Sequence, residues 1–214
     1  MVLKAYCINL KKRKDRLESI KKQFDKIADV LVRIEGVDTN SSYGCGQSHL
    51  KCIQLAKEKN LDYILVIEDD CIFKKGAKKI LLDAIDRLGD DWDILLGGIS
   101  FFKGNIKFKN NLDLFKIDDF SGFFCTVYNK RCYDKMLEWK TIYDNDDSRT
   151  KRKHRHIDRY AGYLSKNNKL NIYCIHPFIA TTIDGFSDIR NKNCNDDIRY
   201  ISKVEKKLDK LKKK

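Results

Sequence analysis

Short apolar runs alternate with helix-length amphipathic segments from residue 2 to about residue 177, and this alternation restricts the fold more than any other feature. Strand-length runs rich in β-branched residues lie at 2–10, 30–34, 63–67, 92–96, 123–128 and 170–175;. Helical spacing of apolar residues lies between them, at 17–27, 46–59, 77–88, 130–140 and 157–164;. The segment 101–115 alternates Phe with Lys and Asn, which suggests a hairpin or an exposed flap. This order of elements predicts an α/β fold.

The length and the charge distribution predict one domain with an appendage. We expect residues 1–192 to form the domain and residues 193–214 to form a basic, helical C-terminal tail;. The net charge of +13 is concentrated in three segments, at 11–16, 151–155 and 202–214. Such a basic rim suits nucleic acid, an anionic membrane or an anionic small molecule, and it is also compatible with a merely solvated surface.

The cysteines and the hydropathy of the sequence indicate the cellular compartment. The eight cysteines form no CxxC pair, so the expectation is reduced thiols and no zinc site;. No stretch approaches the ~20 apolar residues of a membrane span, and the first residues lack the pattern of a signal peptide;. These features predict a cytoplasmic protein without a transmembrane segment, and they leave peripheral membrane contact through the basic tail open.

Three consecutive carboxylates, Glu68, Asp69 and Asp70, follow the apolar run at 63–67. In α/β proteins, ligands collect at the carboxyl ends of such strands. Residues i and i+2 of an extended segment point the same way, so Glu68 and Asp70 can share one cation while Asp69 faces another ligand. Oxygen ligands suit Mg²⁺ or Mn²⁺. The alternative is a solvated turn whose carboxylates cap the next helix.

Several segments, in order, resemble glycosyltransferase family 25, which contains lipopolysaccharide galactosyltransferases and collagen hydroxylysine galactosyltransferases. The matching residues are Ile8-Asn9-Leu10 with Arg13, Asp15 and Arg16; Gly44-Cys45-Gly46-Gln47-Ser48-His49-Leu50; Ile67-Glu68-Asp69-Asp70 with Phe73; Asp91-Trp92-Asp93-Ile94; and the late acidic positions Asp158 and Asp188. The resemblance covers nearly everything before the tail. It implies a GT-A-like fold, which is an open, mostly parallel sheet flanked by helices.

The resemblance also implies a UDP-sugar donor and a divalent cation, usually Mn²⁺, with Mg²⁺ as the alternative. In this interpretation Asp70 is the first choice of metal ligand, and Glu68 binds the metal directly or through water. Asp69 contacts the ribose or the sugar. Asp188 is the metal ligand expected from the far end of the chain. His176 is the competing candidate, and the alternative for this histidine is a structural role.

The nucleotide is expected to contact residues near the first strand and the glycine segment. Asn9, Arg13 and Arg16 fall at the end of that strand and in the turn after it, where open sheets contact nucleotides;. Ser48 and His49 are expected to begin a helix beneath a glycine loop, where backbone N–H groups attract phosphate. The alternatives are a solvated first turn for the arginines and a cap or core role for His49.

An inverting transfer needs a base for the acceptor hydroxyl, and Asp158 is the candidate. Its alternative is a helix-start carboxylate that interacts with the helix dipole. Collagen-type members of the family follow this aspartate with another acidic residue, whereas this chain has Arg159, which weakens any transfer of acceptor specificity.

The resulting interpretation is a metal-dependent inverting glycosyltransferase that moves a hexose from a UDP-sugar to a hydroxyl of a glycan or a modified protein side chain. Galactose is the first candidate for the hexose. UDP-glucose or a UDP-N-acetylhexosamine is the alternative donor. A non-catalytic basic protein that binds nucleic acid or membrane is the alternative class, and nucleic acid is not an expected partner of the transferase. A receiver-like α/β domain is disfavoured, because its acidic cluster would follow the first strand.

Overall fold

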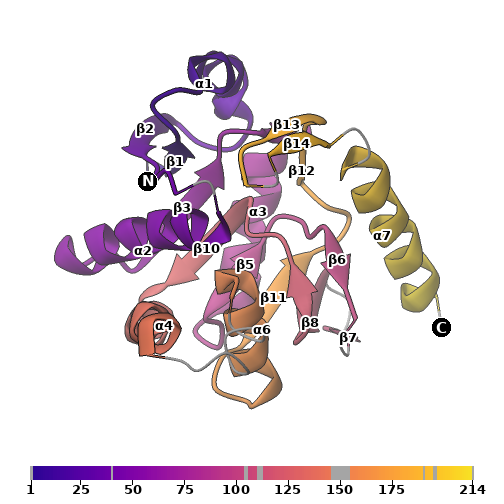
Figure 1. The fold of residues 1–214 in the computed structure, drawn as a ribbon. Helices are drawn as coiled ribbons and strands as arrows, with labels where there is room; N and C mark the ends of the chain where they lie inside the picture. The colour runs from indigo at the N-terminus through magenta and orange to yellow at the C-terminus, as the bar shows by residue number, and fades with distance from the viewer. Residues whose placement is uncertain are drawn as a thin grey trace.

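A computed structural model describes residues 2–39, 41–103, 106–109, 113–145, 155–189, 191–194 and 197–213. In this part of the chain, eight strands form one open sheet in the order β2-β1-β3-β10-β5-β11-β8-β7 (Figure 1). Six of the strands run in one direction, and only β10 and β8 run in the opposite one. The predicted α/β fold, an open and mostly parallel sheet flanked by helices, is confirmed.

The sheet strands are β1 (Lys4–Asn9), β2 (Val30–Glu35), β3 (Tyr63–Glu68), β5 (Ile94–Leu96), β7 (Ile106–Phe108), β8 (Leu114–Ile117), β10 (Cys125–Asn129) and β11 (Ile172–Ile175). Three small pairs join β4 (Cys71–Phe73) to β12 (Ala180–Thr182), β6 (Phe101–Phe102) to β9 (Phe120–Ser121), and β13 (Gly185–Ser187) to β14 (Lys192–Cys194). The helices are α1 (Lys14–Lys21), α2 (Ser42–Glu58), α3 (Ala77–Leu88), α4 (Tyr133–Asn145), α6 (Ile157–Lys166) and α7 (Asp197–Lys212), with 3₁₀ turns at Phe24–Lys26 and Lys130–Cys132.

Helix α2 begins a turn earlier than the predicted start at residue 46. Ser41 caps it, because its hydroxyl accepts a hydrogen bond from the Tyr43 backbone N–H at 3.3 Å. The glycines of this region are helical residues that permit close packing. A Cβ on Gly46 would lie 2.3 Å from the Trp139 ring, and a Cβ on Gly44 would lie 2.3 Å from the Val37 carbonyl oxygen. The glycine loop expected before residue 46 is therefore wrong, since helix α2 already occupies residues 42–46.

The segment 101–115 contributes to sheet edges. β7 and β8 form an antiparallel pair that ends the main sheet, and β6 pairs with β9. This arrangement agrees with the predicted hairpin, in which the Phe115 side chain is buried while Lys107 points to solvent. The basic run at 151–155 lies outside the described residues except for Arg155.

Helix α7 packs on the body of the protein beside β6 and β12, at the edge of the molecule (Figure 1). Ile201 and Leu208 are buried, so one face of this basic helix is apolar. The carboxylate of Glu205 accepts hydrogen bonds from the Phe178 backbone N–H at 2.7 Å and from the Lys74 amine at 2.9 Å. The expected division of the chain at residue 193 stays a prediction.

The carboxyl ends of β1 and β3 meet at one edge of the sheet. The two strands are parallel neighbours, and Ile8 is in register with Glu68. Both strands are buried along most of their length. The polar residues that follow them are therefore held by a rigid scaffold at the position where open α/β sheets bind ligands.

Candidate active site

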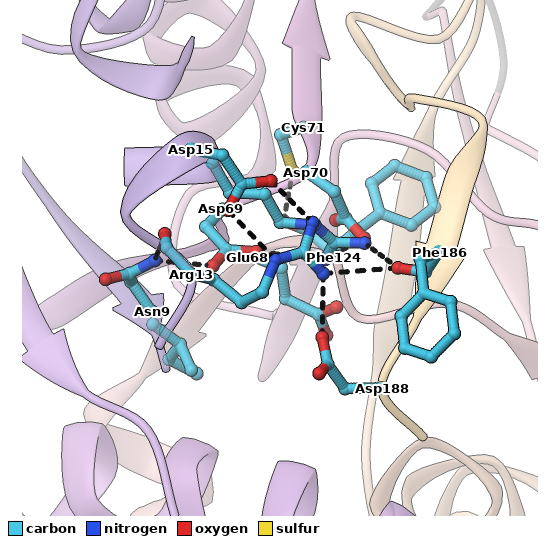
Figure 2. Close-up of polar contacts among 12 residues, drawn as sticks. Asn9, Arg13, Asp15, Glu68, Asp69, Asp70, Cys71, Phe124, Phe186 and Asp188 are labelled. Carbon is cyan, nitrogen blue, oxygen red and sulfur yellow. Dashed lines mark hydrogen bonds and ion pairs between the residues drawn. The ribbon is translucent and has the colours of Figure 1, made fainter. Parts of the chain in front are cut away.

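The acidic triplet lies where β3 ends. Glu68 is the last residue of the strand, and its backbone N–H donates to the Phe124 carbonyl oxygen at 2.8 Å. Asp69 and Asp70 form the turn that leads into β4. Figure 2 shows the three carboxylates gathered beside Arg13 and Asn9. The strand register and this turn thus hold three carboxyl groups in one small volume.

Asp69 is the most enclosed of the three, with 7% of its surface exposed. Its carboxylate accepts hydrogen bonds from the Asn9 amide at 2.7 Å and from the Arg16 guanidinium at 3.1 Å. Burial raises the pKa of Asp69, and the bonds from Asn9 and Arg16 partly oppose this. The carboxylate is thereby fixed in orientation from two sides.

Asn9 lies behind Asp69 and does not line the cavity beside it. Its side chain is buried, donates to the Arg13 carbonyl oxygen at 2.9 Å, and accepts from Arg33 at 2.9 Å. This placement does not favour the predicted contact of Asn9 with nucleotide, which stays a prediction. Its amide joins β1, β2 and the turn after β3, so it positions Asp69.

Asp70 carries the feature that best suits a cation. Its Oδ2 accepts from the Arg16 guanidinium at 3.0 Å, whereas its Oδ1 is buried and has no hydrogen-bond partner among the described residues. Burial, followed by the negative charge of Glu68, raises the pKa of Asp70 to about 7. A buried carboxylate oxygen without a donor is costly, and a divalent cation would relieve that cost.

The pKa shift of Asp70 makes a prediction about stability. Because the folded-state pKa is raised, the folded protein holds a proton that the unfolded chain releases between about pH 4 and about pH 7;. This contribution to stability is present at low pH and is lost as the pH rises through about 7. In EDTA, Asp70→Asn should therefore raise the free energy of unfolding relative to wild type at pH 8, by up to about 4 kcal/mol, and much less at pH 5. Urea unfolding at both pH values checks this, and an equal effect at pH 5 and pH 8 would contradict it.

Glu68 faces α2. Its Oε1 lies 3.3 Å from His49 Nε2 and 3.7 Å from the Cys45 thiol. Burial acts to raise the pKa of Glu68, but the His49 hydrogen bond and charge outweigh it, so the net direction is down. His49 is fully buried, and its other ring nitrogen lies 3.0 Å from the Tyr128 hydroxyl.

Ser48 and His49 lie in the second turn of α2, so their backbone N–H groups are inside the helix and not at its open N-terminus. The predicted helix start at these two residues is therefore wrong, whereas their contact with the nucleotide stays a prediction, and Ser48 lines the cavity beside the triplet. The Ser48 hydroxyl accepts from the Val37 N–H at 2.8 Å and donates to the Gly44 carbonyl oxygen at 2.7 Å. It ties the segment before α2 to the helix.

Ser48→Ala should lower the free energy of unfolding by about 1–3 kcal/mol, because the Val37 N–H would lose its acceptor;. Urea unfolding measures the change. An unchanged unfolding free energy together with a tenfold or greater loss of UDP affinity would instead support the phosphate role expected from the sequence.

Arg13 and Arg16 both reach the hairpin formed by β13 and β14. The Phe186 carbonyl oxygen accepts from Arg13 at 3.2 Å (Figure 2) and from Arg16 at 2.8 Å. Arg13 also pairs with Asp15 at 2.8 Å. The two guanidinium groups therefore lie beside the acidic triplet, and the hairpin reaches them from the opposite side.

Asp188 follows β13 and reaches the same cavity as the triplet, but it is held by cations. Its carboxylate lies 2.7 Å from Arg13 and 3.3 Å from Lys12. Burial acts to raise the pKa of Asp188, and the bonds from Arg13 and Lys12 overcome this and lower it. In this arrangement Asp188 closes the hairpin onto the turn after β1.

His176 is remote from the triplet. Its ring packs against Phe108, Phe115 and Phe178, and its Nε2 lies 2.9 Å from the Asp209 carboxylate of α7. It lines neither of the cavities beside the triplet. Of the two late metal-ligand candidates, only Asp188 is near the acidic residues.

Asp158 lies in the first turn of α6. One of its carboxylate oxygens accepts from the Gly122 backbone N–H at 2.9 Å, and the other accepts from the Arg159 N–H at 2.7 Å. Each oxygen keeps a further lone pair for an incoming hydroxyl. Arg159 itself turns away to Asp119, at 2.7 Å.

Two open cavities meet at the triplet. The first has about 660 Å³ of empty space and is lined by residues such as Arg13, Asp69 and Asp188. The second has about 1310 Å³ and contains Asp158. Their walls share Arg16, Cys45, Glu68, Asp70, Ser187 and Ile189. The end of β3 thus separates two spaces and contributes carboxylates to both.

Two residues at these cavities were missed by sequence reasoning. Cys45 lines both cavities and lies one helical turn before His49, so its i, i+4 spacing was an available signal;. His156 lines the second cavity two residues before Asp158. Partial burial lowers its pKa, which makes it a rival base;. Its place next to Asp158 becomes visible only once α6 is positioned.

An open α/β sheet with paired cavities at the carboxyl ends of its strands is typical of proteins that bind small polar ligands there. Residues 37–164 match the family model of glycosyltransferase family 25 (LPS biosynthesis protein). Because this match covers more than half of the chain, the chain belongs to glycosyltransferase family 25. The family membership predicted from the motifs is confirmed.

Individual relatives agree with this family. A Haemophilus influenzae protein named as a glycosyltransferase is 35% identical over 92 residues, which are 42% of this chain and 31% of that protein. This chain therefore matches only about a third of the length of that relative.

Solved structures also superpose on the chain. A glycosyltransferase involved in glycosylation of the major capsid of PBCV-1 has a TM-score of 0.49 and 10% identity, and the match covers 94% of this chain and 98% of that one. Protein A197 from STIV gives the same TM-score and identity over 91% and 94% of the two chains.

No helix in the described ranges is both long enough and apolar enough to cross a bilayer.

Proposed function

We propose that this chain is a metal-dependent inverting glycosyltransferase that moves a hexose from UDP to a hydroxyl of a glycan or a modified protein side chain. Galactose is the first candidate for the hexose. The observation that carries the proposal is the shared wall of the two cavities. A donor in the first cavity and an acceptor in the second would meet at Glu68 and Asp70, which line both. Membership of glycosyltransferase family 25 supports the reaction class.

The triplet fits a divalent cation, because Asp70 has a buried carboxylate oxygen without a donor among the described residues and Glu68 lies two residues before it. Asp70 and Glu68 are the ligands in this proposal. When bound, a hard cation such as Mn²⁺ or Mg²⁺ would stabilise the charge that gathers on the diphosphate as the sugar bond breaks. Asp188 would join these ligands only by leaving Arg13 and Lys12.

Arg13 and Arg16 supply positive charge on the other side of the first cavity. Both guanidinium groups now bond to the Phe186 carbonyl oxygen, a neutral acceptor. A diphosphate is a stronger partner, since charge-assisted hydrogen bonds are roughly twice as strong as neutral ones. We infer that the diphosphate replaces the carbonyl oxygen and that Asp69, held by Asn9, contacts the ribose or the sugar.

Asp158 takes the proton of the acceptor hydroxyl in this mechanism. Its two backbone hydrogen bonds fix the carboxylate at the wall of the second cavity. An acceptor hydroxyl within hydrogen-bond reach would lose its proton as its oxygen attacks the sugar carbon. The attack and the departure of UDP occur on opposite faces of that carbon, which inverts its configuration.

A panel of nucleotide sugars tests the proposal. The protein is incubated with UDP-galactose, UDP-glucose and UDP-N-acetylhexosamines, with Mn²⁺ or with EDTA, and released UDP and thermal stability are measured. The expected result is a raised melting temperature with one UDP-hexose, together with UDP release as the hexose is transferred to water in place of the acceptor, both dependent on Mn²⁺. The proposal fails if no UDP-sugar stabilises the protein or is turned over.

A further inference from the structure

Three side chains of different chemistry converge at the shared wall of the cavities. Cys45 and His49 are separated by one turn of α2, and Glu68 reaches them from the end of β3. Glu68 Oε1 lies 3.3 Å from His49 Nε2 and 3.7 Å from Cys45 Sγ. The three ligand atoms all lie within 4.8 Å of one another. We call this group the Cys45–His49–Glu68 cluster.

The spacing of the cluster is that of a tetrahedral cation site. Zinc binds nitrogen and oxygen at about 2.0–2.1 Å and thiolate sulfur at about 2.3 Å, so tetrahedral ligand atoms lie roughly 3.3–3.6 Å apart. The two separations that involve Glu68 Oε1, 3.3 Å and 3.7 Å, are close to these values, and the third pair of ligand atoms lies within 4.8 Å. A mixed sulfur, nitrogen and oxygen donor set favours zinc-type ions over Mg²⁺ or Mn²⁺.

Tyr128 supports His49 from behind, in the manner of the outer-shell partners of metal-bound histidines. Its hydroxyl lies 3.0 Å from His49 Nδ1, and both side chains are fully buried. A tyrosine hydroxyl can donate to Nδ1 or accept from it. His49 can therefore donate from Nε2 to Glu68 without a cation, and can bind a cation through Nε2 in the other tautomer.

The cluster is reachable from both cavities. Cys45 and Glu68 line both of them, whereas His49 forms the closed end of the cluster. A cation bound by these three residues would keep one position toward the cavity, as in zinc sites that have three protein ligands.

We propose that the Cys45–His49–Glu68 cluster is a second cation site, specific for zinc-type ions, that competes with the proposed Mn²⁺ site because both use Glu68. Only this competition rests on the proposed function, since the cluster itself stands on its own geometry. The proposal departs from the expectation of no zinc site, which was based on the absence of CxxC pairs. Binding through the Cys45 thiolate must release the thiol proton to solvent.

Titration of the metal-free protein with Co²⁺ alone tests the site, because Co²⁺ replaces zinc and reports its ligands by absorption. The expected result is intense visible bands of a tetrahedral ion together with a near-ultraviolet sulfur-to-cobalt band, both removed by adding Zn²⁺. Cys45→Ser should abolish the sulfur band. Tyr128→Phe, which leaves the three ligands in place, should weaken Co²⁺ binding by about 10–100-fold.

Cys194→Ser is the matched control, since Cys194 lines the second cavity but lies outside the cluster. It should keep the wild-type spectrum. Circular dichroism of each variant shows that it is folded.

Absence of the sulfur band in wild type, or its survival in folded Cys45→Ser, would overturn the second site. If the bands appear but excess Zn²⁺ leaves Mn²⁺-dependent UDP release unchanged, the competition through Glu68 is overturned. Loss of UDP release in all conditions, with the Co²⁺ spectrum intact, would overturn the proposed function alone.

Discussion

Asp70→Asn should lower the rate of UDP release from the UDP-sugar by at least about 10²–10³-fold, which is the loss typical of removing one electrostatic stabiliser of a transition state. Asparagine has nearly the same shape and can still accept a hydrogen bond from Arg16, so the variant should remain folded. The variant loses the negative charge of the carboxylate, whose Oδ1 atom is buried without a donor among the described residues.

The matched control for this variant is Asp83→Asn. Asp83 is a half-exposed carboxylate of α3 that also pairs with an arginine, Arg87, at 2.9 Å. The control should keep wild-type turnover, since pairs of this kind are worth little even for stability. Turnover measured over a range of Mn²⁺ concentrations distinguishes weaker metal binding from lost chemistry. An Asp70→Asn enzyme with wild-type kcat and the same Mn²⁺ dependence would contradict the role of this residue.

Asp158→Asn should lower kcat by about 10²–10⁴-fold and leave the KM for the UDP-sugar little changed. The residue lines only the second of the two cavities, so its loss should affect the acceptor reaction and not donor binding. Asparagine can still accept the Gly122 hydrogen bond that holds the first turn of α6.

His156→Gln is the paired variant for this experiment, because His156 lines the same cavity two residues earlier. We expect it to reduce kcat much less than Asp158→Asn does. A larger loss in His156→Gln would assign the base to the histidine and contradict the role proposed for Asp158. Steady-state kinetics with a fixed acceptor, in the presence of Mn²⁺, provides both comparisons.

Local sequence correctly predicted that the acidic triplet follows the end of a buried strand, because the signal there is local. An apolar strand that ends abruptly in three carboxylates, Glu68 to Asp70, can hardly place them anywhere other than the carboxyl edge of a sheet;. The sequence predicted a nucleotide contact for Arg16 and did not predict its pairing with Asp69 and Asp70, which arises because the turn after β1 lies beside the end of β3.

Other parts of the site depended on contacts that no local pattern encodes. Gly44 and Gly46 looked like loop residues, but their lack of a side chain serves packing against the Val37 carbonyl and Trp139. Helix α2 starts at Ser42, so Ser48 lies in its second turn, where its hydroxyl accepts a hydrogen bond from the Val37 N–H. The sequence likewise predicts a nucleotide contact for Asn9, whereas the structure commits its amide to one local hydrogen bond, with Arg13, and two long-range ones, with Asp69 and Arg33.

The strand order is a second example. Alternating strands and helices do not reveal that β10 enters the sheet in the opposite direction between β3 and β5. This insertion delivers the Phe124 carbonyl oxygen to the Glu68 backbone N–H and the Tyr128 hydroxyl to His49. The hairpin of β13 and β14 is a third example. Its Phe186 carbonyl oxygen accepts hydrogen bonds from Arg13 and Arg16, about 170 residues away in sequence.

The central claim is that the end of β3 binds a divalent cation and the diphosphate of a nucleotide together. The most direct test is the affinity for UDP, measured by calorimetry with Mn²⁺ and with EDTA, in wild type and in Asp70→Asn. We predict that Mn²⁺ strengthens UDP binding at least about tenfold in wild type, a coupling of about 1.4 kcal/mol, and less than about twofold in the variant. Equal UDP affinity with Mn²⁺ and with EDTA in wild type, or an undiminished effect of Mn²⁺ in Asp70→Asn, would contradict it.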